Sequence, residues 1–444
     1  MTPSGDTSAP ARVLGLFDAS SVVIGAIIGV GIFFTPARMA ALVGSGPLLL
    51  LAWAIAGVIV LAGALTFAEL GARYHGSGAQ YEILRDTYGP LPAFLFVFCN
   101  ATAIQGGVIG IIAILCVQNL VVALGRPALG PGWSTLASAG LVAGLAWANL
   151  VGVRWGARIQ NATVIAKVLT LVAIGALGVF APVDDSPVAH ADVHSNGVAG
   201  VLAALVPAFF AFGGYQQALW ISGEVRDPER NLPRAIVIGV ALVIVVYLLA
   251  NVSYLRLLGG VGAVAASKTL AADAVARVAP NVGGRVIAAA VCVSAFGVLN
   301  AQLLSGPRLV FGMARDGRFF PSFGRLHPRF GTPSAAIVFL GGIAITLLVL
   351  AGEKGVDRLL TGAVFVDGVF FALTGAALFV LRRRGGDASF RTPGYPFTPV
   401  LFILGEIGVV VGAHLDPAVL PAALIGAAWI AAAAVLYFVR FRGR

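Results

Sequence analysis

The stretch IGAIIGVGIF at residues 24–33 decides the fold, because it sets three glycines into an apolar run that is long enough to cross a membrane. Glycine inside a helix is less favourable than alanine by ~1 kcal/mol, so a cluster of glycines favours a local break. The stretch FFAFGGYQQAL at residues 209–219 places a glycine pair in a second apolar run. We therefore predict two membrane helices that are interrupted part-way along their length.

The composition excludes a water-soluble protein. Hydrophobic residues make up 59% of the chain and charged residues only 11%, and the mean hydropathy is +0.95. Soluble domains carry about 25% charged residues. The three cysteines lie inside apolar runs, so we expect small buried residues and no disulfide framework. A lipid bilayer is the solvent that fits such a chain.

Apolar stretches of about 20 residues, the length that crosses a bilayer, occur twelve times along the chain. The loops between them are short and leave no room for an inserted soluble domain. The segment 258–284 is less apolar and is expected to hold a short helix on the outer face. The predicted spans are residues 17–43, 47–72, 90–123, 134–151, 159–180, 199–223, 234–257, 285–312, 333–350, 358–381, 397–413 and 417–439.

The Lys and Arg residues predict the orientation, because cytoplasmic loops carry an excess of these residues. With the N-terminus inside, 20 of the 29 fall on the inner side and 8 on the outer side. We therefore expect a multi-pass protein of the plasma (inner) membrane, in contact with lipid, with both termini in the cytoplasm. The same distribution accounts for the net charge of +10 without a nucleic-acid partner.

Each glycine break opens a block of five spans, which predicts two repeats. Interrupted helices at matching positions of two halves are the best sequence indication of a transporter site, although glycines also serve in close helix packing. The predicted parts are a tail at 1–13, a first repeat at 14–180, an outer loop at 181–198, a second repeat at 199–384, an inner loop at 385–396, two further helices at 397–440 and a tail at 441–444.

Unwound backbone in mid-membrane leaves N–H and C=O groups without helical partners, which is tolerated only where the backbone lines a cavity or meets a ligand. The half-helix that starts near Ile32 would point N–H groups at an anion such as a carboxylate. The half-helices that end near Ile28 and Ala211 would point carbonyls at a cation such as an ammonium group. An α-amino acid carries both groups and matches this arrangement without a charged side chain.

Few ionisable residues lie within the predicted spans. Lys167 is the deepest, and a charged lysine in mid-membrane costs ~2.5–3.5 kcal/mol. We therefore expect Lys167 to face the protein interior instead of snorkelling to the interface. Glu69 lies one turn from the cytoplasmic end of its span and is expected to pair with nearby arginines. For Asp367 and Glu406 a structural role is the simpler interpretation.

Five stretches together resemble the amino acid–polyamine–organocation superfamily, and within it the L-amino-acid transporter group and its bacterial relatives. The resemblance extends from about residue 14 to residue 440. It implies an all-α, LeuT-like fold with 12 transmembrane helices, in which two inverted five-helix repeats precede two C-terminal helices. The stretches are IGAIIGVGIF (24–33), ALTFAELGARYHGSGAQYEILRDTYGPLPAFL (64–95), FFAFGGYQQALWISGEVRDPERNLPRAI (209–236), VSAFGVLNAQLLSGPRLVFGMARDGRFFP (293–321) and FRTPGYPFTPVLF (390–402).

The resemblance also implies roles for particular residues in an alternating-access mechanism. Phe210 would gate the site from the outside, and Lys167 would stand where sodium-coupled relatives place an ion. The predicted substrate-binding residues are Ile27, Ile28, Gly29, Val30, Gly31, Ile32, Phe210, Ala211, Phe212 and Gly213. The predicted coupling residues are Lys167, Ser294 and Gly25.

The chain departs from the pattern of that group in three places. Val30 stands where the group usually has serine, so a hydroxyl contact to the substrate carboxylate is lost. IQGGVIG at 104–110 replaces an Arg-Pro-Ser-Ser-like run. The loop at 124–133 lacks the cysteine that vertebrate members use to bond an accessory glycoprotein. We therefore expect no disulfide-linked accessory subunit.

These features predict a sodium-independent secondary transporter of neutral L-amino acids that works by exchange or with protons. A transporter of cationic amino acids or polyamines is an alternative, and Asp367 is the candidate carboxylate for it. A channel is a more distant alternative, because the spans are too uniformly apolar for a continuous polar pore. The five histidines form no metal-binding pattern and no catalytic motif occurs, so we expect no metal, no cofactor and no enzymatic activity.

Overall fold

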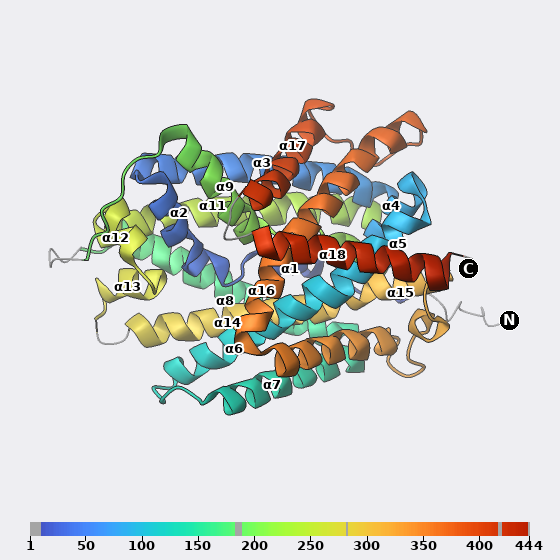
Figure 1. Cartoon of the computed structure of the whole chain (residues 1–444), viewed down its shortest axis with the longest axis horizontal. Coiled ribbons are helices and arrows are strands. Elements are labelled where there is room, and N and C mark those ends of the chain that lie inside the picture. The colour runs from blue at the N-terminus through green and yellow to red at the C-terminus, as the bar shows by residue number, and fades with distance from the viewer. Residues whose placement is uncertain (1–9, 183–188, 281–282, 416–419, 443–444) are drawn as a thin grey trace.

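A computed structural model of the protein describes residues 10–182, 189–280, 283–415 and 420–442, apart from the side chains of residues 131, 351–365, 412–415 and 422. Within these ranges every regular element is helical (Figure 1). The one β contact among them is an isolated bridge between Leu14 and Val225. The prediction of an all-α protein is therefore confirmed.

The chain alternates long helices with short helical turns. The short turns η1, η3 and η4 are 3-10 helices, and η2 and η5 are π-helices. In chain order the elements are α1 (Leu16–Ile27), η1 (Gly31–Phe33), α2 (Thr35–Val43), α3 (Gly46–Arg73), α4 (Ala79–Tyr88), α5 (Pro90–Cys99), η2 (Asn100–Ile104), α6 (Gln105–Ala123), α7 (Pro131–Val151), α8 (Val153–Phe180), α9 (Gly197–Phe212), α10 (Gln217–Trp220), η3 (Ser222–Glu224), α11 (Pro228–Leu258), α12 (Val261–Ala266), α13 (Leu270–Ala276), α14 (Gly283–Ser305), α15 (Pro307–Arg315), η4 (Pro321–Gly324), α16 (Ser334–Arg383), α17 (Phe397–Leu415), α18 (Leu420–Leu436) and η5 (Tyr437–Phe441).

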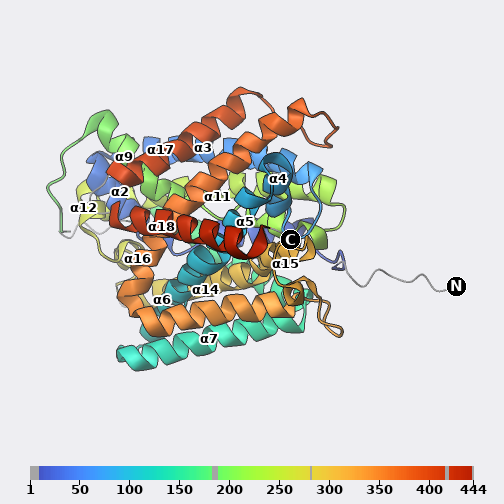
Figure 2. The same cartoon turned by 45° about the vertical axis from the view of Figure 1, so that its right-hand side comes forward.

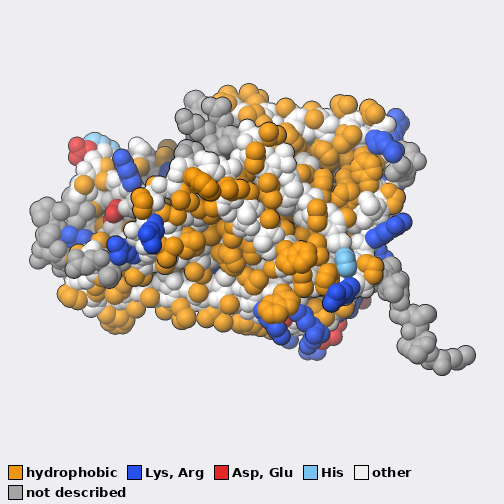
Figure 3. Space-filling model, turned by 90° about the horizontal axis from the view of Figure 1, so that it is seen from below, with side chains coloured by type: hydrophobic (Ala, Val, Ile, Leu, Met, Phe, Trp, Pro, Cys, Tyr) orange, Lys and Arg blue, Asp and Glu red, His pale blue; other side chains and the backbone are white. Residues whose placement is uncertain are grey.

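Eight helical segments within the described residues are long and apolar enough to cross a membrane. Three shorter apolar helices, Leu16–Ile27, Ser334–Leu350 and Phe397–Val411, coincide with further predicted spans. Figure 3 shows hydrophobic side chains over the middle of one face, with Lys and Arg side chains gathered towards its two ends. Apolar side chains face lipid at no cost, whereas charged groups stay near water. The protein is therefore a multi-pass membrane protein.

The largest difference from the sequence prediction concerns α16. We predicted two spans, 333–350 and 358–381, separated by a loop, whereas the backbone is helical throughout Ser334–Arg383. The prediction of a loop at 351–357 is therefore wrong. Figures 1 and 2 show that α16 changes direction, so that one arm runs beside α7 and the other rises towards α17. Hydropathy detects where a segment stops being apolar, but a bent helix keeps its backbone hydrogen bonds through that point.

Two shorter segments also differ from the prediction. The segment 258–284 was expected to hold one short helix, and the structure has two, α12 and α13. Residues 79–88, between two predicted spans, form α4. In both places the helices are of ten residues or fewer, which is too short for the hydropathy of a membrane span to reveal them.

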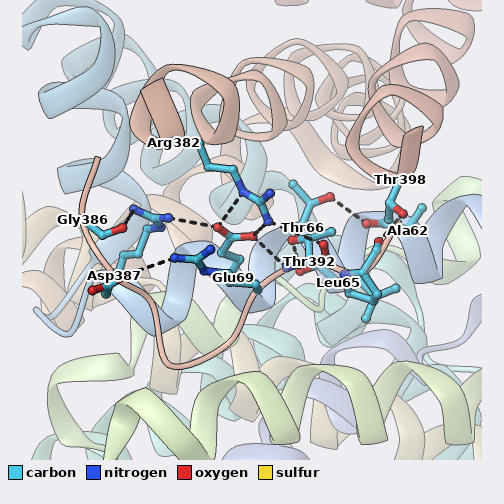
Figure 4. Close-up of polar contacts among 12 residues, drawn as sticks. Ala62, Leu65, Thr66, Glu69, Arg382, Gly386, Asp387, Thr392 and Thr398 are labelled. Atoms are coloured by element: carbon cyan, nitrogen blue, oxygen red, sulfur yellow. Dashed lines mark hydrogen bonds and ion pairs between the residues drawn. The ribbon is translucent and has the colours of Figure 1, made fainter. Parts of the chain in front are cut away.

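Glu69, at the last turns of α3, ties together three parts of the chain (Figure 4). It accepts hydrogen bonds from Arg382 Nε at 2.9 Å, from Arg73 Nη2 at 3.1 Å and from the Thr392 N–H at 2.8 Å. These donors come from α16, from α3 itself and from the segment that precedes α17. The prediction that Glu69 pairs with nearby arginines is confirmed.

A second buried ion pair lies between Arg308 on α15 and Glu224 in η3. Arg308 Nε and Nη2 donate to the two carboxylate oxygens at 3.1 and 3.2 Å, and the side chains are 0% and 1% exposed. Arg308 is one of the 20 Lys and Arg residues assigned to the inner side, and its side chain is completely buried. The pair joins the segment after α10 to the start of α15.

Candidate functional site

The two predicted interruptions are present in the backbone, and they contact each other. The first lies between α1 and η1, and the second follows α9 at Phe212. Gly214 in the second break has φ +124°, and a side chain there would fall 2.7 Å from the carbonyl carbon of Ala26. Only glycine allows both this backbone conformation and this approach. The glycine pair thus lets one break lie directly against the other.

A cavity of about 160 Å³ opens between the breaks. It is lined by the end of α1, the start of η1, the α5–η2–α6 segment, both sides of the second break, and residues of α14, α16 and α17. Helices far apart in the sequence therefore meet at one site. In a membrane such a cavity is where unwound backbone can be accommodated, because a ligand or water can satisfy its polar groups.

Most of the predicted substrate-binding residues lie at this cavity. Those that line it are Ile27, Gly29, Val30, Gly31, Phe210, Ala211 and Gly213. Ile28, Ile32 and Phe212 do not line it. Phe212 is 1% exposed and packs edge-on against Trp53 with ring centroids 5.5 Å apart. Phe210 is half-buried at the cavity, as the gating hypothesis requires of its position.

Lys167 reaches from α8 to the first break. Its ammonium donates hydrogen bonds to the carbonyls of Gly25 and Ile28, both at 2.8 Å, and the residue is 2% exposed. A side chain at Gly297 of α14 would lie 2.7 Å from Lys167 Cε, so the absence of one makes room for the lysine. A buried cation needs such acceptors, since its desolvation is costly. The structure thus brings Lys167 and Gly25 together.

Ser294 of α14 contacts the same backbone. Its hydroxyl donates to the carbonyls of Ile28 at 3.3 Å and Gly29 at 3.1 Å. The Ile28 carbonyl therefore receives hydrogen bonds from both Lys167 and Ser294. This carbonyl was expected to meet a substrate ammonium, whereas it lies off the cavity and is already bonded to two side chains.

Tyr247 of α11 bridges the two breaks, and the sequence analysis missed it. Its hydroxyl lies 3.0 Å from the Ile27 carbonyl and 3.2 Å from the Ala211 carbonyl. Tyrosine is common in apolar spans and gives no signal of such a contact by itself. The bridge shows that the ends of α1 and α9 point carbonyls at one place, next to the cavity.

The first break also presents backbone N–H groups. In the η1 turn the Phe33 N–H donates to the Val30 carbonyl at 3.1 Å, and the Phe34 N–H donates to the Gly31 carbonyl at 3.1 Å. The N–H groups that precede a helical turn have no partner within it. The second half-helix was expected to start near Ile32, whereas a 3-10 turn comes first and α2 begins at Thr35. Val30 and Gly31 line the cavity at this end.

Polar amide side chains complete the wall, and sequence reasoning missed them because it considered only ionisable residues. Asn100 and Gln105 lie at the π-turn η2 and the start of α6 and line the cavity. Gln217 Nε2 donates to Gln302 Oε1 at 2.9 Å at the same cavity. The amides are visible in the printed sequence as polar residues within apolar spans, so a search for all polar residues in spans would have found them.

Asp367 and Glu406 also line the cavity. They come from α16 and α17, far in the sequence from both breaks. A structural role was the simpler interpretation of the sequence, and the structure adds that both residues lie at the cavity wall. Among the described residues, no group of three or more His, Cys, Asp and Glu side chains is arranged to hold a metal ion.

A cavity between two interrupted helices of a multi-pass membrane protein is typical of transporters. The family model for amino acid permeases matches residues 14–443, which is nearly the whole chain. The chain therefore belongs to the amino acid permease family, within the amino acid–polyamine–organocation superfamily, as the motifs predicted. It is an amino acid transporter and not an enzyme.

Named relatives cover most of the chain. It is 30% identical over 402 residues to the serine/threonine exchanger SteT of Bacillus subtilis (strain 168), an alignment that spans 90% of each protein. It is 31% identical over 389 residues to the human large neutral amino acids transporter small subunit 2, covering 85% of this chain and 71% of the relative. It is 32% identical over 421 residues to the human b(0,+)-type amino acid transporter 1, covering 91% and 83%.

Proposed function

We propose that this protein is a sodium-independent transporter that exchanges neutral L-amino acids by alternating access around the cavity between the two breaks. The observation that carries the proposal is the paired backbone of these breaks. Val30 and Gly31 at the start of η1 line the cavity, and so do Ile27 and Ala211, whose carbonyls converge on one hydroxyl, that of Tyr247. A zwitterion supplies the carboxylate and the ammonium that suit these groups.

Lys167 supports the independence from sodium. Its ammonium is within 2.8 Å of two carbonyls that the break frees from helical bonding. Carbonyl oxygens are also what a sodium ion would need, so the lysine occupies the place and supplies the charge of such an ion. A fixed ammonium favours exchange, because no ion has to enter or leave with the substrate.

The names of the relatives support an exchange of neutral amino acids. One relative is named a serine/threonine exchanger and another a transporter of large neutral amino acids. Val30 adds a branched side chain to the cavity wall, and the cavity is only about 160 Å³. We therefore propose substrates of small to medium size, such as alanine, serine, valine and leucine.

The proposed architecture is the LeuT-like one. It has two inverted five-helix repeats at 14–180 and 199–384, followed by two helices at 397–440. Both termini face the cytoplasm, because 20 of the 29 Lys and Arg residues then lie on the inner side. The protein works in the lipid bilayer without a disulfide-linked accessory subunit. A reporter fused after Arg444 that is active only outside the cell would contradict this orientation.

The test of function is counterflow in liposomes that contain the purified protein. Liposomes loaded with unlabelled leucine should accumulate labelled leucine, and replacement of sodium by choline should leave the rate within about twofold. Loading with arginine or spermidine should give far less accumulation. A large loss of uptake in choline would remove Lys167 from the role of sodium surrogate, and uptake that never saturates would indicate a channel.

A further inference from the structure

The cavity has an acidic wall that the exchange of neutral amino acids does not use. Asp367 on α16 and Glu406 on α17 both line the cavity, and Glu406 is 5% exposed. Asp367 Oδ1 is buried without a hydrogen-bond partner. Among the described residues, no Lys or Arg side chain forms an ion pair with either carboxylate. An isolated buried carboxylate is costly, so this wall calls for a positively charged partner.

The two acidic residues lie on neighbouring helices, at the same part of the cavity wall. α16 and α17 pack together, and a side chain at Gly368, the residue after Asp367, would fall 3.6 Å from Glu406 Oε2. A second negative charge beside the first is unfavourable in a poorly hydrated interior, and a proton shared between the two groups removes it.

A second observation also points to a ligand. Asn100 and Gln105 line the same cavity, are 1% and 2% exposed, and have side-chain oxygens, Oδ1 and Oε1, without hydrogen-bond partners. Together with Asp367 Oδ1, three buried acceptor oxygens at this cavity have no donor. Buried polar groups are nearly always hydrogen-bonded. An occupant that brings hydrogen to this wall would satisfy them, and a protonated carboxyl group is such a donor.

The neighbourhood favours a proton over a metal cation. Phe371, one turn after Asp367, and Val409, close to one turn after Glu406, line the cavity and offer no oxygen. Hard metal cations such as calcium and magnesium take six or more oxygen ligands. A proton needs only one acceptor, and a carboxylate pair suffices.

Other titratable groups near the pair are few. Tyr215 lies in the field of Glu406, and its buried hydroxyl has no hydrogen-bond partner. The packed elements α6, α7, α9, α18 and η2 contain no acidic, basic or histidine residue. Charged residues on α3, α4, α14, α15 and α16 are Glu69, Arg73, Glu82, Arg85, Asp86, Arg285, Arg308, Arg315, Arg382 and Arg383, together with 353, 354, 357 and 358, whose side chains are not described. Lys167 belongs to α8, which packs mainly on α1, α11 and α14.

We propose that Asp367 and Glu406 form a proton-binding site that couples a proton to the net movement of a neutral amino acid. A proton from the side of higher concentration binds a carboxylate oxygen of the pair while the cavity faces that side. It leaves from the same pair when the cavity faces the other side, and no covalent bond of the substrate changes. The inference rests on the proposed transport of neutral amino acids. It assigns net uptake to this pair and leaves exchange to the backbone site and Lys167.

The experiment uses liposomes that hold the full-length protein and an internal pH-sensitive dye, without internal amino acid. An inward leucine gradient should acidify the lumen of wild-type liposomes. The Asp367→Asn/Glu406→Gln variant should lose at least about tenfold of this acidification relative to its own rate of leucine counterflow, which is measured in the same preparation. Asp387→Asn, at an exposed carboxylate, is the matched control and should behave as wild type. Asp367→Glu keeps a titratable group and should retain acidification.

Several outcomes would contradict the proposed proton-binding site. Acidification by the double variant equal to wild type would do so. Wild-type counterflow of leucine without any acidification would also do so, and would leave the proposed function intact. Transport of arginine or spermidine that Asp367→Asn abolishes would replace the proton with a cationic substrate. If no neutral amino acid shows counterflow in wild-type liposomes, the proposed function fails first. Size-exclusion profiles confirm that each variant is folded.

Discussion

Three buried glutamates, Glu69, Glu224 and Glu406, differ in their partners. Glu69 and Glu224 are 0% exposed, and arginine side chains donate to each of them. Glu406 is 5% exposed and forms no ion pair among the described residues. Glu69 and Glu224 join segments that are far apart in the sequence, whereas Glu406 lines the cavity. Burying a carboxylate is costly in all three places, so the difference lies in the group that supplies the positive charge.

The comparison separates fixed contacts from exchangeable ones. A carboxylate with a permanent arginine partner holds two segments together and has no need of a ligand. A carboxylate without one is stabilised only when a mobile positive charge arrives. The same distinction applies to the backbone of the two breaks. Lys167 is a permanent, charged partner of the Gly25 and Ile28 carbonyls. Among the described residues, the Ile27 and Ala211 carbonyls at the cavity have no charged side chain as a partner. The predictions below test this division, beginning with the strongest permanent contact.

Loss of Arg308 should have the largest effect on stability. Arg308→Ala leaves Glu224 buried without a counter-charge, and breaking a buried ion pair costs about 3–5 kcal/mol. The melting temperature of the purified protein in detergent should fall by many degrees, or the protein should fail to accumulate. Arg391→Ala is the control, because its pair with Asp387 is exposed at 67% and 99% and is worth about 0–1 kcal/mol. Equal melting temperatures for the two variants would contradict the distinction.

Phe210 and Phe212 should separate gating from packing. Phe210 is half-buried at the cavity, so Phe210→Ala should reduce leucine counterflow about tenfold or more with little change in melting temperature. Phe212 is 1% exposed and packs on Trp53, so Phe212→Ala should instead lower stability by about 3–5 kcal/mol. Counterflow and thermal melting of both variants provide the measurements. Near-normal transport by Phe210→Ala would end the gating hypothesis.

Substitution of Lys167 tests whether the first break needs its permanent partner. Lys167→Ala leaves the Gly25 and Ile28 carbonyls without their ammonium donor, which costs about 1–3 kcal/mol for an unsatisfied buried group. Counterflow should fall about fivefold or more, and addition of sodium should not restore it. Thr170→Val is a control on the same helix, because the Thr170 hydroxyl bonds only to the Ala166 carbonyl. Unchanged transport by Lys167→Ala would remove the lysine from the mechanism.

Much of the fold follows from composition, because an apolar run of span length in a membrane protein has few alternatives to a helix. The glycine clusters predicted where two helices break, and the depth of Lys167 predicted that it turns inward. The bend of α16 was missed, because hydropathy records where charge begins and not whether backbone hydrogen bonds stop there. Helix boundaries were missed for the same reason. For example, the 3-10 turn η1 precedes α2, which begins only at Thr35.

The sequence predicted only some of the residues that line the cavity. Its backbone residues were found, because a break exposes N–H and C=O groups whatever the side chains are. Asn100 was missed because only ionisable residues were considered, and Tyr247 was missed because the sequence does not show which side of α11 faces the breaks. Asp367 and Glu406 line the cavity together because α16 turns towards α17, and no local pattern in either helix predicts that arrangement.

The smallest expected effect comes from Tyr247, which bridges the carbonyls of Ile27 and Ala211. Tyr247→Phe removes the bridging hydroxyl but keeps the ring that packs on Trp53. The Ile27 carbonyl then keeps the Gly29 N–H as its donor, the Ala211 carbonyl loses the hydroxyl, and a bound ammonium can take the place of the missing donor. Substrate binding should therefore become tighter by about 0.5–1.5 kcal/mol, the net worth of a typical hydrogen bond, so the KM for leucine should fall two- to tenfold.

Tyr254 provides the matched control for this prediction. It lies two turns further along α11, and its buried hydroxyl has no hydrogen-bond partner to lose. Tyr254→Phe should therefore leave the KM for leucine unchanged. A KM that rises in Tyr247→Phe would mean that the hydroxyl itself holds the substrate or the geometry of the breaks. The Ile27 and Ala211 carbonyls would then belong with the permanently satisfied contacts, and the ammonium would have to bind at the acidic wall instead.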